Sequence, residues 1–259
     1  MTSIKRDKLN NLITQMPADV VLTSKWLKEQ GISTKLAWWY VHSGWLEHLG
    51  EGAYRKIGET VTAFGAISAL QMQLKLPLHI GGKTALALLG QSHFIPRLGI
   101  KSMAIFAQPG TLIPKWVHNQ AIWGDAFKIY KPNLFQLENI KLGIVEITRD
   151  KVSFLLSTPE RAALEMLYLV PTQQSYEEAL LLLESLNQLR PDILQILLER
   201  CTSIKVKRLF LYLADTYQHP WLTELDLKKI DLGKGKRVIG KGGKYSAQYQ
   251  LSVPKVAGE

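Results

Sequence analysis

The alternation of apolar and polar residues predicts three short helices at the start of the chain. In residues 3–16, apolar residues share one helical face and charged residues occupy the other. Residues 24–30 and 34–43 have the same helical spacing, and each segment is followed by glycine, a common helix stop. Only residues 31–33 separate the second helix from the third. Because two short helices joined by a tight turn with glycine form a helix-turn-helix, we predict this motif here.

Residues 45–57 predict a β-hairpin after the third helix. Two short runs rich in β-forming residues, 45–49 and 53–57, are joined by a Gly-Glu-Gly turn. Glycine supplies the positive φ angles that a hairpin turn requires. A helix-turn-helix followed by a hairpin is typical of a winged helix. The alternative is a generic helical module with a hairpin, since such modules also serve protein–protein contacts.

From residue 59 onward, short apolar strands alternate with amphipathic helices. Residues 102–110 and 142–148 have the length and composition of strands, and residues 79–90 predict a short strand that leads into a helix. Further helices are predicted to begin at Thr158-Pro159 and at Ser175, followed by two more amphipathic helices. The end of the chain combines basic, glycine-rich turns with a closing strand.

These elements predict a mixed α/β fold of the α+β class. An N-terminal winged helix-turn-helix domain, residues 1–58, precedes a larger C-terminal domain, residues 59–259, that ends in helices and a basic hairpin. A further division of the C-terminal domain into an α/β part, 59–155, and a helical and basic part, 156–259, is left open.

Charge is distributed unevenly along the chain, whose net charge is +10. Residues 1–58 hold eight Lys and Arg against five Asp and Glu, residues 59–199 hold twelve of each, and residues 200–259 hold twelve against five. Two basic ends around a neutral middle are typical of a protein that contacts a polyanion at two places. Basic surfaces also serve solubility alone, so the pattern supports nucleic-acid binding without requiring it.

Composition excludes several classes of protein. No apolar run reaches the roughly 18 residues that cross a bilayer, and the N-terminus lacks the apolar block of a signal peptide. We therefore expect a cytoplasmic protein with no membrane partner. The one cysteine, Cys201, excludes an internal disulfide and a multi-cysteine metal site. Its apolar helical surroundings favour a buried structural thiol.

The third predicted helix divides its aromatic residues between two faces. Trp39 faces the core, as does Trp45 at the start of the hairpin, whereas Lys35, Trp38 and His42 recur on the opposite face. Free N–H groups and positive charge at the start of this helix suit a phosphate, and such a helix fits the major groove of DNA. The residues expected to contact DNA are Ser33, Thr34, Lys35, Trp38, His42, Arg55 and Lys56, the last two on the wing. A protein contact through Trp38 is the alternative.

The segment "GKRVIGKG" at 235–242 is close to a phosphate-binding P-loop, but it has glycine where Ser or Thr would hold magnesium. A strand-like alternation follows the segment, whereas a P-loop opens a helix, so ATP hydrolysis is not expected. A flexible basic loop that touches nucleic acid, or a solvated hairpin tip, explains it better. We define the second basic surface as Lys234, Lys236, Arg237, Lys241 and Lys244.

Patterns typical of catalysis are missing from the sequence. The six histidines have no metal-binding spacing, and there is no G-x-S-x-G nucleophile turn. The neighbouring carboxylates Glu177 and Glu178 start a predicted helix, where a solvated role is usual. We therefore predict a binding protein with no enzymatic activity, metal or cofactor.

Five segments together resemble the AbiEi family of antitoxins from AbiE-type abortive-infection systems. They are "SGWLEHLGEGAYR" at 43–55, "HIGGKTALALLG" at 79–90, "STPERAALEML" at 157–167, "VKRLFLYLAD" at 206–215 and "IDLGKGKRVIGKGGKYSAQYQLSVP" at 230–254. Their order and spacing are more specific than any one of them.

The resemblance implies a bacterial transcriptional regulator of a type IV toxin–antitoxin operon, encoded beside a nucleotidyltransferase toxin. It implies that the winged helix represses the operon by binding promoter DNA at inverted repeats, while the C-terminal domain counteracts the toxin without a stable complex. It places DNA contact on Ser33, Thr34, Lys35, Trp38 and Arg55, and it assigns the second basic surface to DNA or to the toxin's RNA substrate. The alternative is a protein- or RNA-interaction module that neutralises the toxin by direct contact, without specific DNA readout.

Overall fold

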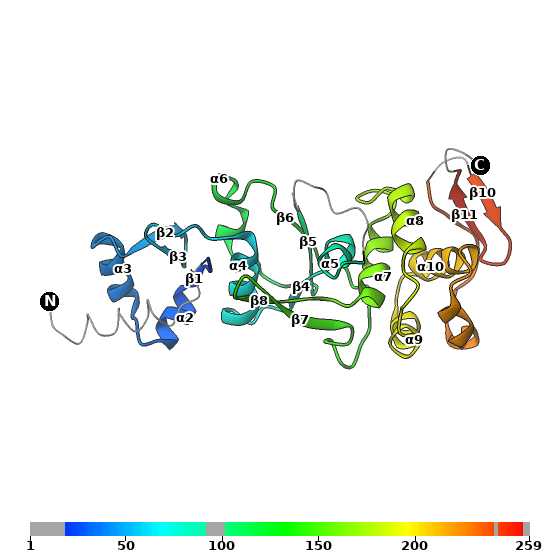
Figure 1. Ribbon diagram of the computed structural model, residues 1–259, viewed down its shortest axis with the longest axis horizontal. Helices are drawn as coiled ribbons and strands as arrows, with labels where there is room; N and C mark the ends of the chain where they lie inside the picture. Colours follow the sequence, from blue (N-terminus) through cyan, green and yellow to red (C-terminus); the bar gives the residue numbers. More distant parts are fainter. Residues whose placement is uncertain (1–18, 92–101, 241–242, 256–259) are drawn as a thin grey trace. The chain divides into compact units, whose positions relative to one another are not determined.

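The computed structural model describes residues 19–91, 102–240 and 243–255 (Figure 1). The helix predicted for residues 3–16 lies outside these ranges. The chain folds into two compact units. The first runs to His79 and includes Gly110–Ile129 and Glu146–Leu155, and the second holds Ile80–Pro109, Tyr130–Val145 and the chain from Leu156 onward.

The predicted winged helix-turn-helix is confirmed in the first unit. Its elements are β1 (Leu22–Thr23), α2 (Ser24–Glu29), α3 (Thr34–His42), β2 (Leu46–Gly50) and β3 (Ala53–Lys56). The strands form an antiparallel sheet in the order β1-β3-β2. The hairpin of β2 and β3 is the wing.

Local sequence signals set the ends of the two helices. The hydroxyls of Thr23 and Ser33 cap α2 and α3, each accepting a backbone N–H at 3.2 Å. Gly31 and Gly44 follow the helices with φ of 78° and 71°, the left-handed conformation that glycine adopts without strain. After α2, the N–H of Ile32 bonds the carbonyl of Leu27 at 2.8 Å, which satisfies an otherwise free carbonyl at the helix end.

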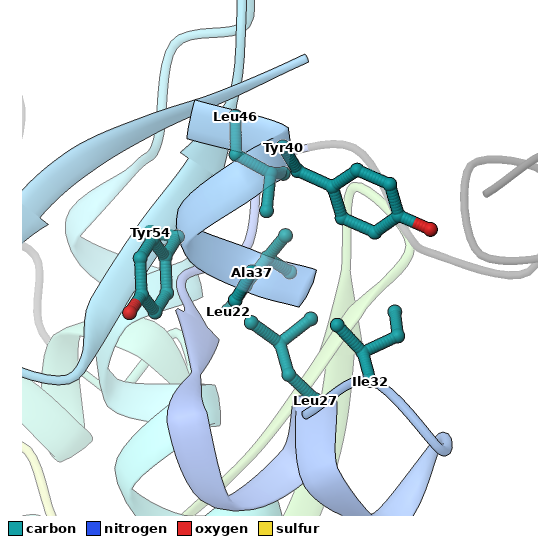
Figure 2. Close-up of a cluster of buried hydrophobic side chains, with 7 residues drawn as sticks. All are labelled: Leu22, Leu27, Ile32, Ala37, Tyr40, Leu46 and Tyr54. Carbon is teal, nitrogen blue, oxygen red and sulfur yellow. The ribbon is translucent and has the colours of Figure 1, made fainter. Parts of the chain in front are cut away.

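The core of the winged helix draws on every one of these elements. It consists of Leu22, Leu27, Ile32, Ala37, Tyr40, Leu46 and Tyr54, whose side chains converge around α3 (Figure 2). Trp39 packs against this cluster, as predicted. The prediction that Trp45 is a core residue is wrong, because its side chain is 39% exposed. Successive residues of a strand face opposite sides, so the buried Leu46 directs the preceding Trp45 outward.

Residues beyond the wing belong to the same compact unit. Helix α4 (Ala63–Ser68) continues into a π-helical turn, Ala69–Gln73. The Gln73 amide accepts from the backbone N–H and hydroxyl of Thr23 at 2.9 and 3.0 Å, and it donates to the Val21 carbonyl at 2.7 Å. The division after residue 58 that the sequence suggests stays a prediction.

The strands predicted in the middle of the chain join a five-stranded sheet. Its strands, in spatial order, are β6 (Phe127–Tyr130), β5 (Met103–Ala107), β4 (Leu78–Ile80), β8 (Val152–Ser157) and β7 (Ile144–Arg149). Strands β4 and β8 run parallel, with Ile80 opposite Leu156. The predicted strand and helix at residues 79–90 are β4 and α5 (Gly82–Leu88).

Four longer helices form much of the second unit, as the sequence predicts. They are α7 (Pro159–Leu169), α8 (Tyr176–Glu184), α9 (Pro191–Arg200) and α10 (Ile204–Thr216). Shorter helical segments are Lys115–His118, α6 (Gln120–Trp123), Pro220–Glu224 and Leu227–Lys229. None of the helices in the described ranges is long and apolar enough to cross a membrane.

The last described elements form a small sheet that carries Arg237 and Lys244 of the second basic surface. Its strands are β9 (Arg237–Val238), β10 (Gly243–Ser246) and β11 (Leu251–Pro254), in the order β10-β11-β9. Strand β10 pairs antiparallel with β11, whereas β9 is parallel to it. The predicted basic hairpin therefore corresponds to β10 and β11, with β9 added at the far edge.

Candidate nucleic-acid interface

The start of α3 presents positive charge to solvent. Ser33 uses its hydroxyl to cap the helix, whereas the side chains of Thr34 and Lys35 are exposed. Lys35 forms no ion pair with any residue in the described ranges. Because the first N–H groups of a helix lack partners within it, this end can accept an anion.

Trp38 and His42 form one exposed aromatic unit further along α3. The Trp38 side chain is 59% exposed, and its ring stacks on that of His42 with 3.6 Å between centroids. The Nδ1 atom of His42 lies 2.9 Å from the Trp38 carbonyl oxygen, which orients the imidazole along the helix. Lys35, Trp38 and His42 thus share the face of α3 opposite the core.

The two cations of the wing, Arg55 and Lys56, are each paired with a glutamate, which the sequence analysis did not predict. The Arg55 guanidinium donates from Nε and Nη2 to the two carboxylate oxygens of Glu47, both at 2.8 Å. Glu47 and Arg55 are opposite each other in the β2–β3 register, so their side chains meet on one face. Lys56 forms an ion pair with Glu59 at 3.2 Å. Sequence reasoning missed these two carboxylates, although the hairpin register would have identified Glu47.

The second basic surface depends on a buried arginine. Lys234, Lys236 and Lys244 are exposed and Arg237 is partly exposed, whereas Lys241 lies outside the described residues. Arg208 on α10 is 2% exposed, and its guanidinium donates to four backbone carbonyls at 2.5–3.1 Å. The acceptors are Leu232, Gly233, Gly235 and Gln250. The guanidinium therefore fixes the backbone on both sides of Lys234 and directly before Lys236.

Arg208 was not predicted as a functional or structural residue. In the sequence it is one of four charged residues of a largely apolar helix, and such charges usually face water. Its acceptors are main-chain carbonyls 24–42 residues away, so no pattern of side chains reveals them.

The two most deeply buried glutamates of the second unit are tied into structural contacts. Glu160 accepts from Arg190 and from the Thr158 hydroxyl at 3.0 and 2.6 Å. Burial alone would raise the pKa of Glu160, but the hydrogen bonds from Arg190 and Thr158 outweigh it and lower the pKa. Glu165 accepts from the Ser157 hydroxyl at 2.7 Å and from Arg161 at 3.0 Å.

Glu165 also explains a double glycine of the sequence. Its carboxylate accepts the Gly82 N–H at 3.2 Å, and a Cβ atom at Gly81 would lie 2.2 Å from its Oε2 atom. Only glycine at position 81 leaves room for this close approach. The glycines of this segment therefore serve packing between α5 and α7.

Two further kinds of reactive group are the cysteine thiol and the side chains that could bind a metal ion. The Cys201 thiol is buried, as predicted, and burial raises its pKa to about 11. Within the described part of the chain, no cluster of three or more His, Cys, Asp or Glu side chains is arranged to hold a metal ion.

Comparison with known proteins gives two consecutive family matches. Residues 5–97 match the family described as "Transcriptional regulator, AbiEi antitoxin N-terminal domain". Residues 101–254 match the family described as "Transcriptional regulator, AbiEi antitoxin, Type IV TA system". No curated protein sequence matches the chain.

Among solved structures, the chain is similar to the crystal structure of the RV2827C protein from Mycobacterium tuberculosis. The two are 16% identical, and the superposition covers 98% of this chain and 92% of that chain with a TM-score of 0.61. At this identity the similarity concerns the fold alone. The family match over residues 101–254, by contrast, spans more than half of the sequence. The protein therefore belongs to the AbiEi antitoxin family, the transcriptional regulators of type IV toxin–antitoxin systems.

Proposed function

We propose that the protein is an antitoxin that represses its own operon by binding promoter DNA through the winged helix. The observation that carries this proposal is the exposed face of α3. A capped helix start, the Trp38–His42 stack and a lysine, Lys35, that has no ion pair within the described ranges lie together there. An α-helix fits the major groove, and residues on its N-terminal half reach base edges there.

The two ends of α3 have different roles in this proposal. Thr34 and Lys35 approach a phosphate or a base edge, because they flank the free N–H groups at the helix start. Trp38 and His42 lie further along the same face and contact the groove wall or a thymine methyl group. Ser33 acts through its cap, which fixes where the helix begins.

Arg55 and Lys56 contact the DNA backbone from the wing. Both are paired with glutamates in the free protein, so a phosphate has to compete with Glu47 and Glu59. Arg55 is 30% exposed in its side chain, which leaves the guanidinium accessible to a phosphate oxygen. The two hydrogen bonds to Glu47 orient the Arg55 guanidinium in the free protein, and a phosphate takes the place of the carboxylate when DNA binds.

The proposal includes two further partners, a polyanion and a toxin. The second basic surface supplies a further contact with a polyanion, and the C-terminal domain counteracts a nucleotidyltransferase toxin in the cytoplasm. Inverted repeats in the promoter would place two copies of the chain on one operator.

Fluorescence anisotropy with the promoter duplex tests this proposal. At near-physiological salt, we expect the protein to prefer the promoter over a scrambled duplex. Lys35→Ala weakens promoter binding by about 1–3 kcal/mol if Lys35 reads a base. Lys28→Ala, which removes the same charge from an exposed position of α2, is the matched control and should bind almost normally. Equal affinity of the wild type for both duplexes would refute the proposal.

A second candidate function is supported by the exposed apolar residues of the winged helix. Trp45 and Ile57 are 39% and 56% exposed, and the N–H of Ile57 bonds the Trp45 carbonyl at 3.2 Å, so both lie at one end of the wing. Such a patch suits direct contact with a protein, including the toxin. Co-purification of the chain with the neighbouring gene product, lost on Trp45→Ser, would favour this candidate.

A further inference from the structure

The outer face of the C-terminal sheet carries a row of exposed side chains. Val238 of β9 is opposite Ser252 of β11, and Ser252 is opposite Tyr245 of β10. Val238 and Tyr245 are 67% and 44% exposed, whereas Leu251, next to Ser252, is fully buried. Since neighbours along a strand face opposite sides, the row of Val238, Ser252 and Tyr245 faces solvent.

Lys236 lies on the face of this row, whereas Arg237 and Lys244 are opposite the buried Leu251 and Val253 and start from the other face of the sheet. Lys236 places its Nζ atom 5.1 Å from the centre of the Tyr245 ring, so it lies on the same face. Lys234, Lys236, Arg237 and Lys244 form no ion pair with any residue that the structure describes. Other cations of this unit do, including Lys83 with Glu178 and Arg190 with Glu160. Positive charge is thus left available on the sheet.

The sheet presents these groups on a preorganised backbone. Gly233 and Gly235 adopt φ of 63° and 76°, which makes the sharp turns that lead into β9. Arg208 holds the carbonyls of both glycines and of Gln250, the residue before β11. A ligand therefore meets strands whose conformation is already set, which lowers the entropy lost on binding.

We propose that this face binds single-stranded nucleic acid. An unpaired base stacks on Tyr245 beside Val238, and Lys236, together with Lys234 on the turn before β9, contacts the flanking phosphates. Aromatic side chains on an open basic sheet are the usual platform for single strands, because every unpaired base exposes a flat apolar face. In duplex DNA the flat faces of the bases are stacked on one another and are not available to Tyr245. An acidic peptide carries negative charge but has no such flat faces. Lys236 covers the ring in the free protein, and its flexible stem lets the ammonium move to a phosphate when a base arrives.

The test uses the full-length protein and three fluorescent probes. They are a 12-nucleotide oligouridine, a 12-base-pair duplex without promoter sequence, and a polyglutamate peptide. We expect the oligouridine to bind more tightly than polyglutamate. The winged helix also binds the duplex, so the duplex is the probe whose binding Tyr245 should not affect. Tyr245→Leu, which keeps an apolar side chain at an exposed position, should weaken oligouridine binding about 5- to 100-fold. Tyr168→Leu, at a similarly exposed tyrosine of α7, is the matched control and should bind normally.

Salt dependence tests the cations separately. Lys234→Gln and Lys236→Gln should each reduce the slope of log K against log salt by about 0.7, as expected for one phosphate contact on a single strand. Lys141→Gln removes a charge from an exposed position elsewhere in the same unit and should leave the slope unchanged. Unfolding curves of the variants that match the wild type exclude loss of structure as the cause.

Three results would overturn the proposal. They are equal binding to polyglutamate and to oligouridine, unchanged oligouridine affinity in Tyr245→Leu, and a loss in Tyr245→Leu that is as large for the duplex as for oligouridine. Lys35→Ala separates this proposal from promoter repression, because it should weaken promoter binding and leave oligouridine binding intact. If Lys35→Ala abolishes oligouridine binding, the winged helix holds the single strand, and the sheet does not.

Discussion

The Nη1 atom of Arg208 donates a hydrogen bond to the carbonyl oxygen of Gly235 at 2.5 Å. This contact joins the buried face of α10 to the turn before β9, and the same guanidinium reaches three further carbonyls. A buried cation is costly unless its donors are satisfied. Here the four backbone carbonyls accept hydrogen bonds from the guanidinium, so the buried charge of Arg208 is compensated. This buried charge supports the turns that carry the exposed lysines Lys234 and Lys236.

Replacing Arg208 should destabilise the second unit. Arg208→Met keeps most of the side-chain volume but leaves the four carbonyls without their donor, which lowers the free energy of unfolding by about 2–4 kcal/mol. Urea unfolding measures the loss. Arg200→Met is the control, because Arg200 is 54% exposed with one long ion pair to Glu138, and it should cost less than about 1 kcal/mol. Equal effects of the two substitutions would contradict this account of Arg208.

The end of α10 offers a stabilising substitution. Gln218 follows the helix with φ of 52°, where α2 and α3 are followed by glycine in the same conformation. Its side chain is exposed, so Gln218→Gly removes backbone strain at little other cost and should raise the free energy of unfolding by about 0.5–1 kcal/mol.

Replacing Gly44 with glutamine tests the same left-handed backbone conformation in the opposite direction. Gly44 has φ of 71°, and nothing lies within 4 Å of the Cβ that a substitution would add. Gly44→Gln should therefore cost about 1 kcal/mol through backbone conformation alone. Thermal unfolding of both variants tests the pair, and a destabilised Gln218→Gly would show that the glutamine side chain contributes contacts of its own.

Stability should decrease in mild acid because of His219. The ring is buried against Trp221, with 4.8 Å between centroids, and its Nε2 atom lies 3.0 Å from the Leu183 carbonyl. Burial lowers the pKa of His219 below the ordinary 6.5, so the unfolded chain binds a proton more readily than the folded chain. The contribution of the neutral ring is complete above pH 6.5 and is lost as the pH falls from 6.5 toward the folded-state pKa.

Two substitutions separate titration of His219 from packing. His219→Gln should flatten the decline of unfolding free energy between pH 7 and pH 5. Trp221→Phe removes the stacked indole but keeps the imidazole, and it should retain the decline at a lower overall stability. If His219→Gln leaves the pH profile unchanged, another group is responsible.

Freeing Arg55 from Glu47 should strengthen promoter binding. Glu47→Gln removes the bidentate carboxylate and a negative charge from the wing, and the gain should be about 2- to 5-fold, the size of an exposed ion pair. Arg55→Gln should weaken binding to promoter and scrambled duplexes alike and reduce the salt slope by about 1. Anisotropy titrations at several salt concentrations measure both. An Arg55→Gln variant with normal affinity would leave Arg55 a purely structural role in the wing.

The helices of the winged helix could be predicted because their signals are local. Thr23 and Ser33 cap helices that begin at the next residue, and Gly31 and Gly44 end them within one turn. Helical periodicity also separated the exposed Trp38 from the partly buried Trp39. Trp45 was misjudged because hydrophobicity alone does not say which of two neighbouring strand residues faces the core.

The sequence by itself determined the winged helix, the four longer helices of the second unit, several helix caps and the family, because these depend on residues close together in the chain or on the order of motifs along it. It did not reveal strands β6 and β8. The hairpin register pairs Glu47 with Arg55, which the sequence could have shown, whereas the tertiary structure alone decided that Arg208 is buried beneath the turns that carry Lys234 and Lys236. It also aligned Val238 and Tyr245 on one open sheet face. The burial of Arg208 and the alignment of Val238 with Tyr245 both depend on segments that only folding brings together. The spacing of apolar residues carries no information about which polar group will contact which carbonyl.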